Sequence, residues 1–172
     1  MKRTEKGIGK RRMAREMATQ MLYQLDLGNC SPPEAFAVFD IVEYLATSKE
    51  ERSQESEAEG AARPRSRLEE AREAFAQARG MVDGVQEHRA EIDSRIRAQA
   101  EHWRLERMPA VDRNILRLAV WEMLFDPEVP KLVVLDEAVE LAKRFGSEQS
   151  GRFVNGLLDG LMRGLDEAGP GA

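Results

Sequence analysis

Apolar side chains recur at helical spacing along most of this sequence, and no segment alternates apolar and polar residues in the manner of a strand. The first stripe, within residues 10–27, consists of Met13, Ala14, Met17, Ala18, Met21, Leu22 and Leu25. The other side of this segment carries Arg11, Arg12, Arg15 and Thr19. The pattern predicts an amphipathic helix whose outer face is basic.

Capping residues mark the start of a second helix. Ser31 is followed by two prolines, and Glu34 stands three residues after Ser31, which is the arrangement of a capping box with proline in the first turn. We expect this helix to bury the apolar residues Phe36, Phe39, Val42 and Leu45.

Residues 47–67 interrupt the helical pattern. They contain no large apolar side chain, and they balance five acidic residues against five basic ones. Such a segment buries too little apolar surface to offset the entropy that is lost when it becomes ordered. We therefore expect a disordered insertion within a single domain that spans residues 1–172, and a flexible arm at residues 1–9.

Helical periodicity resumes after this segment and continues towards the end of the chain. The helices expected there start at Leu68, Pro109, Pro130 and Ser147. Gly80 and Gly84, in the first of them, are candidates for a break or for close packing against a neighbour. The whole pattern predicts an all-α fold, an irregular bundle of about six or seven helices.

Charge is unevenly distributed between the first 15 residues and the rest of the chain. The net charge is −5, but residues 1–15 hold seven basic residues against one acid, a charge of +6 that leaves −11 for the rest. An acidic body with a basic arm favours local capture of a polyanion. No stretch approaches the ~20 apolar residues of a membrane helix, and the single cysteine, Cys30, excludes an internal disulfide. We expect a cytoplasmic protein with no membrane association.

Residues that could support catalysis or hold a metal do not form a recognisable arrangement. His88 and His102 stand fourteen residues apart without paired ligands. The segment from Gly7 to Lys10 lacks the spacing and the preceding strand of a phosphate-binding loop. No GxSxG, HExxH or CxxC sequence is present. We therefore expect no catalytic residues, no metal and no cofactor.

The basic face of the first helix is the remaining chemical signal. Arg15 stands four residues after Arg11 and three after Arg12, so the three guanidinium groups share one side of the helix. Like charges at this spacing repel unless an anion neutralises them, and RNA offers both phosphates and unstacked bases that fit guanidinium planes. Charge alone leaves three interpretations open: an RNA site, a solvated surface helix, or a site for an acidic protein.

Three parts of the chain contain specific strings that helix periodicity does not demand. They are residues 12–23 (RMAREMATQMLY), residues 103–108 with 111–124 (WRLERM, VDRNILRLAVWEML), and residues 129–130, 137–145 and 153–159 (VP, EAVELAKRF, FVNGLLD). Together they resemble the NusB family of transcription antitermination factors. The resemblance covers nearly the whole chain apart from the insertion and the Gly-Pro-Gly tail.

The resemblance implies an all-helical fold of two packed sub-bundles and a factor that has no catalytic residues. It implies recognition of the boxA element of ribosomal RNA transcripts jointly with NusE, a small-subunit ribosomal protein, and suppression of termination by RNA polymerase with other Nus factors. The implied RNA-binding residues are Lys10, Arg11, Arg12, Arg15, Gln149 and Arg152. Trp121 and Glu122 are implied to face NusE. A homodimer that hides the basic surface is also compatible with the resemblance.

Several matching residues also have purely structural interpretations. Those expected in the core are Trp103, Phe153 and Leu157. Arg117 and Glu122 are expected to form surface ion pairs between helices. Gln149 departs from the family, where an acidic residue is common, and the missing negative charge should favour the approach of phosphate. The alternative function is a helical protein-interaction module or accessory RNA-binding module without an antitermination role.

Overall fold

The computed structural model describes residues 3–28, 30–53 and 64–169, and every regular element in this part of the chain is a helix. The helices are α1 (Arg3–Leu27), α2 (Pro32–Val38), α3 (Ile41–Ser53), α4 (Pro64–Glu87), α5 (Arg89–Gln99), α6 (Ala110–Phe125), α7 (Lys131–Phe145) and α8 (Ser150–Ala168), with a short 3₁₀ helix, η1 (Leu105–Arg107). The all-α prediction is confirmed. The described residues form eight α-helices, where the sequence predicted six or seven.

A break between α2 and α3 accounts for part of this difference. The capping residues at Ser31 act as predicted, since the carboxylate of Glu34 accepts a hydrogen bond from the backbone N–H of Ser31 at 2.7 Å. The helix then ends early, and Asp40 starts a new one. Its Oδ1 accepts hydrogen bonds from the backbone N–H groups of Val42 and Glu43 at 2.8 and 3.0 Å. An aspartate in this position satisfies N–H groups that have no partner within the helix.

A second break separates α4 from α5, at His88 and not at either glycine. The imidazole of His88 stacks on the ring of Phe125 in α6, with the ring centroids 3.8 Å apart. Gly84 has the predicted role in close packing, because a Cβ atom there would lie 2.4 Å from the indole of Trp121. Gly80 has open space around it, so the prediction of close packing is wrong for that residue.

The observed helices extend into both segments that the sequence predicted to be irregular, the arm at residues 1–9 and the insertion at residues 47–67. Helix α1 begins at Arg3, ahead of the predicted start at Lys10, so most of the expected arm at residues 1–9 is helical. Residues 47–53 continue α3, and residues 64–67 belong to α4. The helices therefore extend further into the 47–67 segment than the sequence predicted, and residues 54–63, the middle of the expected insertion, lie outside the described residues.

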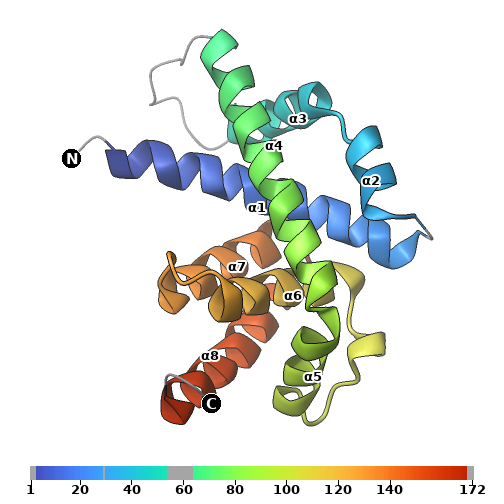
Figure 1. Cartoon of the computed structure of the whole chain (residues 1–172), viewed down its shortest axis with the longest axis vertical. Helices are drawn as coiled ribbons and strands as arrows, with labels where there is room; N and C mark the ends of the chain where they lie inside the picture. Colours follow the sequence, from blue (N-terminus) through green and yellow to red (C-terminus); the bar gives the residue numbers. More distant parts are fainter. Residues whose placement is uncertain (1–2, 29, 54–63, 170–172) are drawn as a thin grey trace.

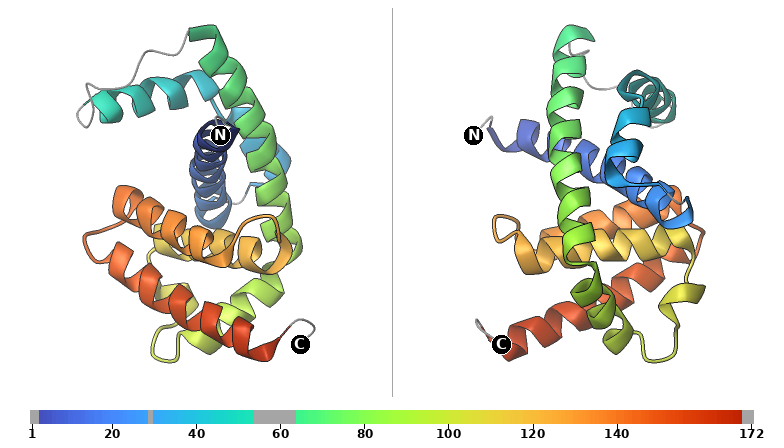
Figure 2. Two further views of the ribbon diagram at one scale, coloured as in Figure 1. Left: turned by 90° about the vertical axis from the view of Figure 1, so that its left-hand side faces the viewer. Right: turned by 45° about the vertical axis from the view of Figure 1, so that its right-hand side comes forward.

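The helices form two groups that meet along α1. Helices α1 to α4 pack among themselves, and so do α5 to α8, while α6 packs against both α1 and α4. Figure 1 shows α1 crossing the middle of the molecule, and the left view in Figure 2 looks along it, with α4 beside it and α7 below. Because neighbours cover α1 on several sides, little of its middle is left for solvent.

The core occupies the space between these helices. Every apolar position predicted for α1 from Met13 to Leu22 is buried, and Leu25 packs against the same cluster. The stripe of α8 is likewise confirmed, with Val154, Leu157, Leu158 and Leu161 buried. Burying side chains of this size contributes about 1.5–3 kcal/mol each. The apolar stripes therefore fix which face of α1 and of α8 turns inward.

Candidate nucleic-acid interface

Arg15 lies beneath the surface, although the sequence predicted an exposed position. Its side chain is only 4% exposed, and its guanidinium donates to both carboxylate oxygens of Glu122 on α6, from Nε to Oε2 at 2.9 Å and from Nη2 to Oε1 at 3.0 Å. Glu122 is itself 1% exposed. A bidentate pair of this kind combines charge attraction with a fixed geometry. Arg15 and Glu122 therefore tie α1 to α6.

Arg11 belongs to the same cluster, one turn earlier on α1. Its Nη2 donates to Oε1 of Glu122 at 3.0 Å and also pairs with Asp126, which follows the end of α6. Burial alone would lower the pKa of Arg11, but the hydrogen bonds to Asp126 and Glu122 outweigh it and raise that pKa above its ordinary value. Only 18% of the Arg11 side chain is exposed.

The side chains of Lys10 and Arg12 are more exposed than those of Arg11 and Arg15. Arg12 pairs with Glu137 on α7 through two hydrogen bonds, from Nε at 3.0 Å and from Nη2 at 2.7 Å, yet 45% of its side chain is exposed. These hydrogen bonds lower the pKa of Glu137 below its ordinary value, although partial burial opposes the shift. Lys10 is paired with the exposed Glu73 of α4 at 2.8 Å, and 37% of its side chain is exposed.

The basic face of α1 is thus matched by acids from the other half of the protein. Three arginines of α1 pair with three carboxylates, which are Glu122, Asp126 and Glu137. The prediction of an exposed basic face is wrong for Arg15 and also for Thr19, which is buried and donates its hydroxyl to the backbone oxygen of Arg15. The physical reason is that α6 packs against α1 and covers this side of it. Only Arg12 keeps a large exposed fraction among the three arginines.

Gln149 and Arg152 stand at the other predicted contact point, where α8 begins. Gln149 occupies the N-cap position of α8 and Arg152 lies in its first turn, both exposed. The expected cap, Ser147, instead donates its backbone N–H to the hydroxyl of Ser150 at 2.9 Å. Arg12 meets α7 at Glu137, whereas the start of α8 follows the end of α7. Arg12 therefore lies at the middle of α7, whereas Gln149 and Arg152 lie beyond its C-terminal end.

Arg152 lines a hollow together with residues of the turn between α5 and η1. His102, Trp103 and Phe153 also line this space of about 510 Å³. Trp103 is 62% exposed, so the prediction that it lies in the core is wrong. Its ring meets that of Phe153 edge-on, with centroids 5.8 Å apart. An exposed indole beside a guanidinium offers a stacking surface and a positive charge in one place.

The residues expected to face a protein partner are differently placed. Glu122 is buried beneath α1, so its predicted role as a partner contact is wrong for the protein in this conformation. Trp121 is half-buried and packs on Gly84. Tyr23 and Leu27 were not among the contact residues predicted from the sequence, yet they are 39% and 60% exposed on the last turns of α1. Exposed aromatic and aliphatic side chains that are close together are typical of a protein contact.

A second buried ion-pair cluster joins the end of α1 to α5 and α6. The carboxylate of Asp26 accepts hydrogen bonds from Arg113 at 2.8 Å and from Asn114 at 3.0 Å, and it also pairs with Arg117 at 3.2 Å. Arg117 is bidentate with Asp93 on α5. The predicted surface ion pairs of Arg117 and Glu122 are therefore replaced by buried ones with other partners. An acid at the C-terminal end of a helix is unfavourable by itself, and the arginines offset that cost.

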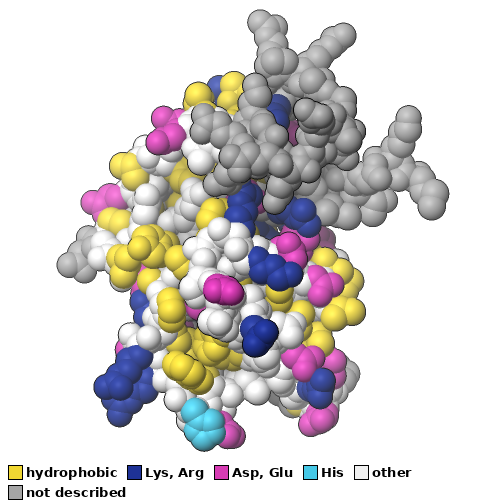
Figure 3. All heavy atoms as spheres, turned by 180° about the vertical axis from the view of Figure 1, so that it is seen from behind, with side chains coloured by type: hydrophobic (Ala, Val, Ile, Leu, Met, Phe, Trp, Pro, Cys, Tyr) yellow, Lys and Arg dark blue, Asp and Glu magenta, His cyan; other side chains and the backbone are white. Residues whose placement is uncertain are grey.

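Two features were searched for in the described part of the chain, a cluster of metal-ligating side chains and a membrane-spanning helix. No group of three or more His, Cys, Asp or Glu residues there is placed to hold a metal ion. None of the described helices combines the length and the apolar character that a membrane span requires. Acidic and basic side chains are interspersed with apolar patches over the back of the molecule (Figure 3).

Known proteins provide a clear match to this chain. The profile of the NusB family matches residues 12–163. The transcription antitermination protein NusB of Sorangium cellulosum is 43% identical over 158 residues, which cover 92% of this chain and 95% of that protein. Homology of this extent also implies a shared fold.

Solved structures agree with the sequence match. A crystal form of T. maritima NusB superimposes with a TM-score of 0.66 at 31% identity, covering 89% of this chain and 90% of that one. A structure described as antitermination factors NusB and NusE in complex with dsRNA gives a TM-score of 0.64 at 28% identity, covering 90% and 97%. The chain therefore belongs to the NusB family, a family of non-enzymatic transcription antitermination proteins.

Proposed function

We propose that this protein binds boxA-type single-stranded RNA of ribosomal RNA transcripts together with the ribosomal protein NusE. In the cytoplasm, the complex joins RNA polymerase and other Nus factors and suppresses premature termination. Family membership supports the antitermination role, and a structural relative has been solved with NusE and double-stranded RNA. The RNA-binding residues, the partner and the RNA sequence are parts of the proposal.

The observation that carries the proposal is the exposed indole of Trp103 beside Arg152. Single-stranded RNA is bound through bases stacked on aromatic or guanidinium planes and through phosphates paired with cations. The hollow at the start of α8 supplies both, and His102 adds a group that can donate a hydrogen bond. Gln149 stands close by in sequence and adds no negative charge that would repel phosphate.

The second proposed contact is the accessible part of α1, formed by Lys10 and Arg12. Both keep more than a third of their side chains exposed, and a phosphate can approach them without unfolding the helix. Arg11 contributes less because Glu122 and Asp126 already hold it. Arg15 supports the surface indirectly, by fixing α1 on α6. Because acids neutralise much of this face, the protein alone should bind RNA weakly, and NusE should supply further contacts.

Tryptophan fluorescence tests the first contact directly. The chain has two tryptophans, so a Trp121→Phe variant leaves Trp103 as the only one. We expect boxA-like RNA to quench this fluorescence, and Arg152→Ala to weaken the binding about fivefold. Arg163→Ala is the matched control, because Arg163 is an exposed arginine of the same helix, 72% exposed and paired with Asp159. RNA binding without quenching, or equal losses in the two variants, would remove the Trp103 hollow from the proposal.

A protein-interaction module without an antitermination role is the alternative, and the exposed Tyr23 and Leu27 favour it. It predicts that NusE binds while RNA binds neither the protein nor the complex. If a homodimer covers the basic surface, the free protein should have the mass of a dimer, and RNA should dissociate it into monomers. Light scattering with and without RNA distinguishes that state from a monomer.

A further inference from the structure

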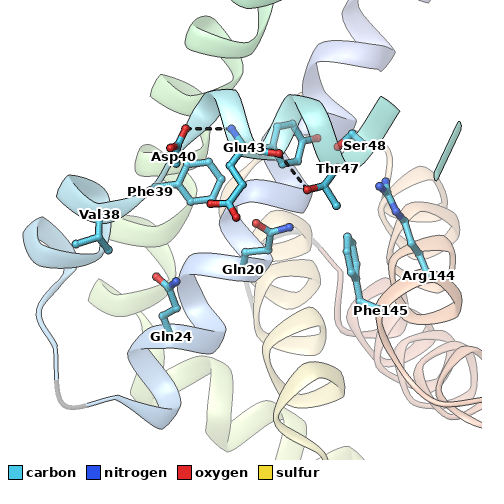
Figure 4. Close-up of a pocket in the computed structure, with 11 residues that line it drawn as sticks. Gln20, Gln24, Val38, Phe39, Asp40, Glu43, Thr47, Ser48, Arg144 and Phe145 are labelled. Atoms are coloured by element: carbon cyan, nitrogen blue, oxygen red, sulfur yellow. Dashed lines mark hydrogen bonds between the residues drawn. The ribbon is translucent and has the colours of Figure 1, made fainter. Parts of the chain in front are cut away.

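A second hollow, away from the Trp103 site, opens between α1, α3 and the end of α7. It has a volume of about 260 Å³. Its walls come from these helices and from the corner between α2 and α3, and they include Gln20, Gln24, Val38, Asp40, Glu43 and Arg144. Figure 4 shows the side chain of Glu43 extending from α3 toward α1, where it ends near Gln20, with Gln24 one turn further along and the Phe145 ring on the other side. We call this hollow the α1–α3 cleft.

The charged groups at the base of the α1–α3 cleft neutralise one another. Arg144 pairs with Glu16, which also accepts a hydrogen bond from the hydroxyl of Tyr44 at 2.5 Å. Burial, with the nearby Glu16 charge, raises the pKa of Tyr44 well above its ordinary value, so the hydroxyl stays protonated. The positive charge of Arg144 is therefore matched by Glu16.

The rim of the cleft is negative. Asp40 and Glu43 add two carboxylates, and within the described part of the chain Glu43 has no hydrogen-bond or ion-pair partner for its side chain. Oδ1 of Asp40 caps α3. Two like charges beside an otherwise neutral space repel phosphate and attract a cation. The charge of the cleft therefore favours a lysine or arginine side chain over RNA.

The two glutamines supply a spacing that suits a polypeptide. Gln20 and Gln24 are four residues apart on one helix, which places them about 6 Å apart along its axis. Peptide groups that face the same way in an extended chain repeat every ~6.6 Å. Each amide can donate to and accept from a peptide group, and neither has a partner among the described residues. Val38, 71% exposed, adds an apolar contact at the edge.

From this arrangement we propose that the α1–α3 cleft binds an extended, basic polypeptide segment of a protein partner. The segment runs along α1, its backbone hydrogen-bonds to Gln20 and Gln24, and a lysine or arginine side chain reaches Glu43. Backbone contacts of this kind recognise an extended chain, and the acid selects its charge. The inference does not depend on RNA binding, so a failure of the RNA site leaves it standing.

NMR of the side-chain amides tests the proposal on the full chain. The probe is a capped five-residue peptide of alternating valine and lysine, and the matched probe replaces lysine by glutamate. We expect the Gln20 and Gln24 amide signals to shift with a dissociation constant of about 0.1–1 mM. Glu43→Gln should weaken binding at least about threefold, whereas Glu87→Gln, an exposed site at the end of α4, should not.

Three outcomes would overturn the proposal. The first is no shift of the two amide signals at about 5 mM lysine peptide. The second is an equal response to the glutamate peptide, which would show that the carboxylates do not select charge. The third is a larger shift of the same amides with single-stranded RNA than with the lysine peptide, which would assign the cleft to RNA.

Discussion

The guanidinium of Arg15 and the carboxylate of Glu122 form a buried, bidentate ion pair that joins the first helix to the second half of the protein. Arg15, which its spacing from Arg11 and Arg12 predicts as an RNA contact, thus has a structural partner. This pair separates two roles among the basic residues of α1. Arg15 holds the helix in place, while Lys10 and Arg12 remain accessible.

Removing one partner of this pair should destabilise the protein. Arg15→Ala leaves Glu122 buried with less compensation, and we expect the free energy of unfolding to fall by about 3–5 kcal/mol. Urea denaturation followed by circular dichroism measures this. The double variant Arg15→Met with Glu122→Leu should recover much of the loss, because it buries no uncompensated charge at these two positions. A loss below about 1 kcal/mol in Arg15→Ala would show that the pair is not structural.

Glu137→Gln should strengthen RNA binding. The carboxylate of Glu137 holds Arg12 through two hydrogen bonds, and removing its charge leaves the guanidinium for phosphate. An ion pair in which one partner is as exposed as Arg12 is worth about 0–1 kcal/mol, so the gain should be about two- to fivefold. Fluorescence anisotropy with labelled RNA at fixed salt checks it. Glu140→Gln, on the same helix but paired with Lys143, should change little. Weaker binding in Glu137→Gln would mean that Glu137 positions Arg12 for RNA.

Gln149→Asp should weaken RNA binding. The substitution places a negative charge at the start of α8, beside the surface proposed for phosphate. We expect a loss of about threefold at low salt that shrinks as salt rises. Ser94→Asp, which adds the same charge at an exposed position of α5, is the control. Equal or tighter binding by Gln149→Asp would place the RNA away from this end of α8.

How far the sequence could predict the fold depends on whether a feature is local. The apolar stripes of α1 and α8 predicted the buried faces because helical periodicity alone determines them. The burial of Arg15 was not predictable, since it depends on Glu122, which stands 107 residues later. The three acids that pair with the arginines of α1 are visible in the sequence, but only packing shows where they lie.

The same limit explains the error at Trp103. A tryptophan in a conserved-looking string suggests a core position, because large aromatic residues are usually buried. Trp103 instead follows the end of α5 in a turn, where the residue is 62% exposed and its ring meets Phe153 edge-on. The hint available in the sequence was the group of polar neighbours on both sides, His102 and Arg104.

The stability of the protein should fall in acid partly through Asp26. Burial alone would raise the pKa of Asp26, but hydrogen bonds from Arg113 and Asn114, with Arg117, outweigh it and lower the pKa below 3.8. A carboxyl group whose pKa is lowered on folding stabilises the folded state at pH values above 3.8. This contribution is lost as the pH falls through the pKa that the group has in the folded protein. Asp26→Asn should be less stable at neutral pH and lose less stability on acidification. Urea denaturation at several pH values from neutral to acidic gives the free energy of unfolding of both proteins as a function of pH. Parallel curves for the wild type and Asp26→Asn would show that Asp26 does not cause the loss in acid.

The most direct test of the proposed function is a titration of labelled boxA-like RNA with this protein, with and without NusE. We expect weak binding by the protein alone, tighter binding with NusE, and a preference over a scrambled RNA of the same length. Affinity should fall with rising salt, and Arg12→Ala with Arg152→Ala should flatten that slope by about 0.7 for each lost phosphate contact. If RNA does not bind even with NusE, or if binding depends neither on the RNA sequence nor on these two arginines, the protein does not bind boxA RNA in the proposed way.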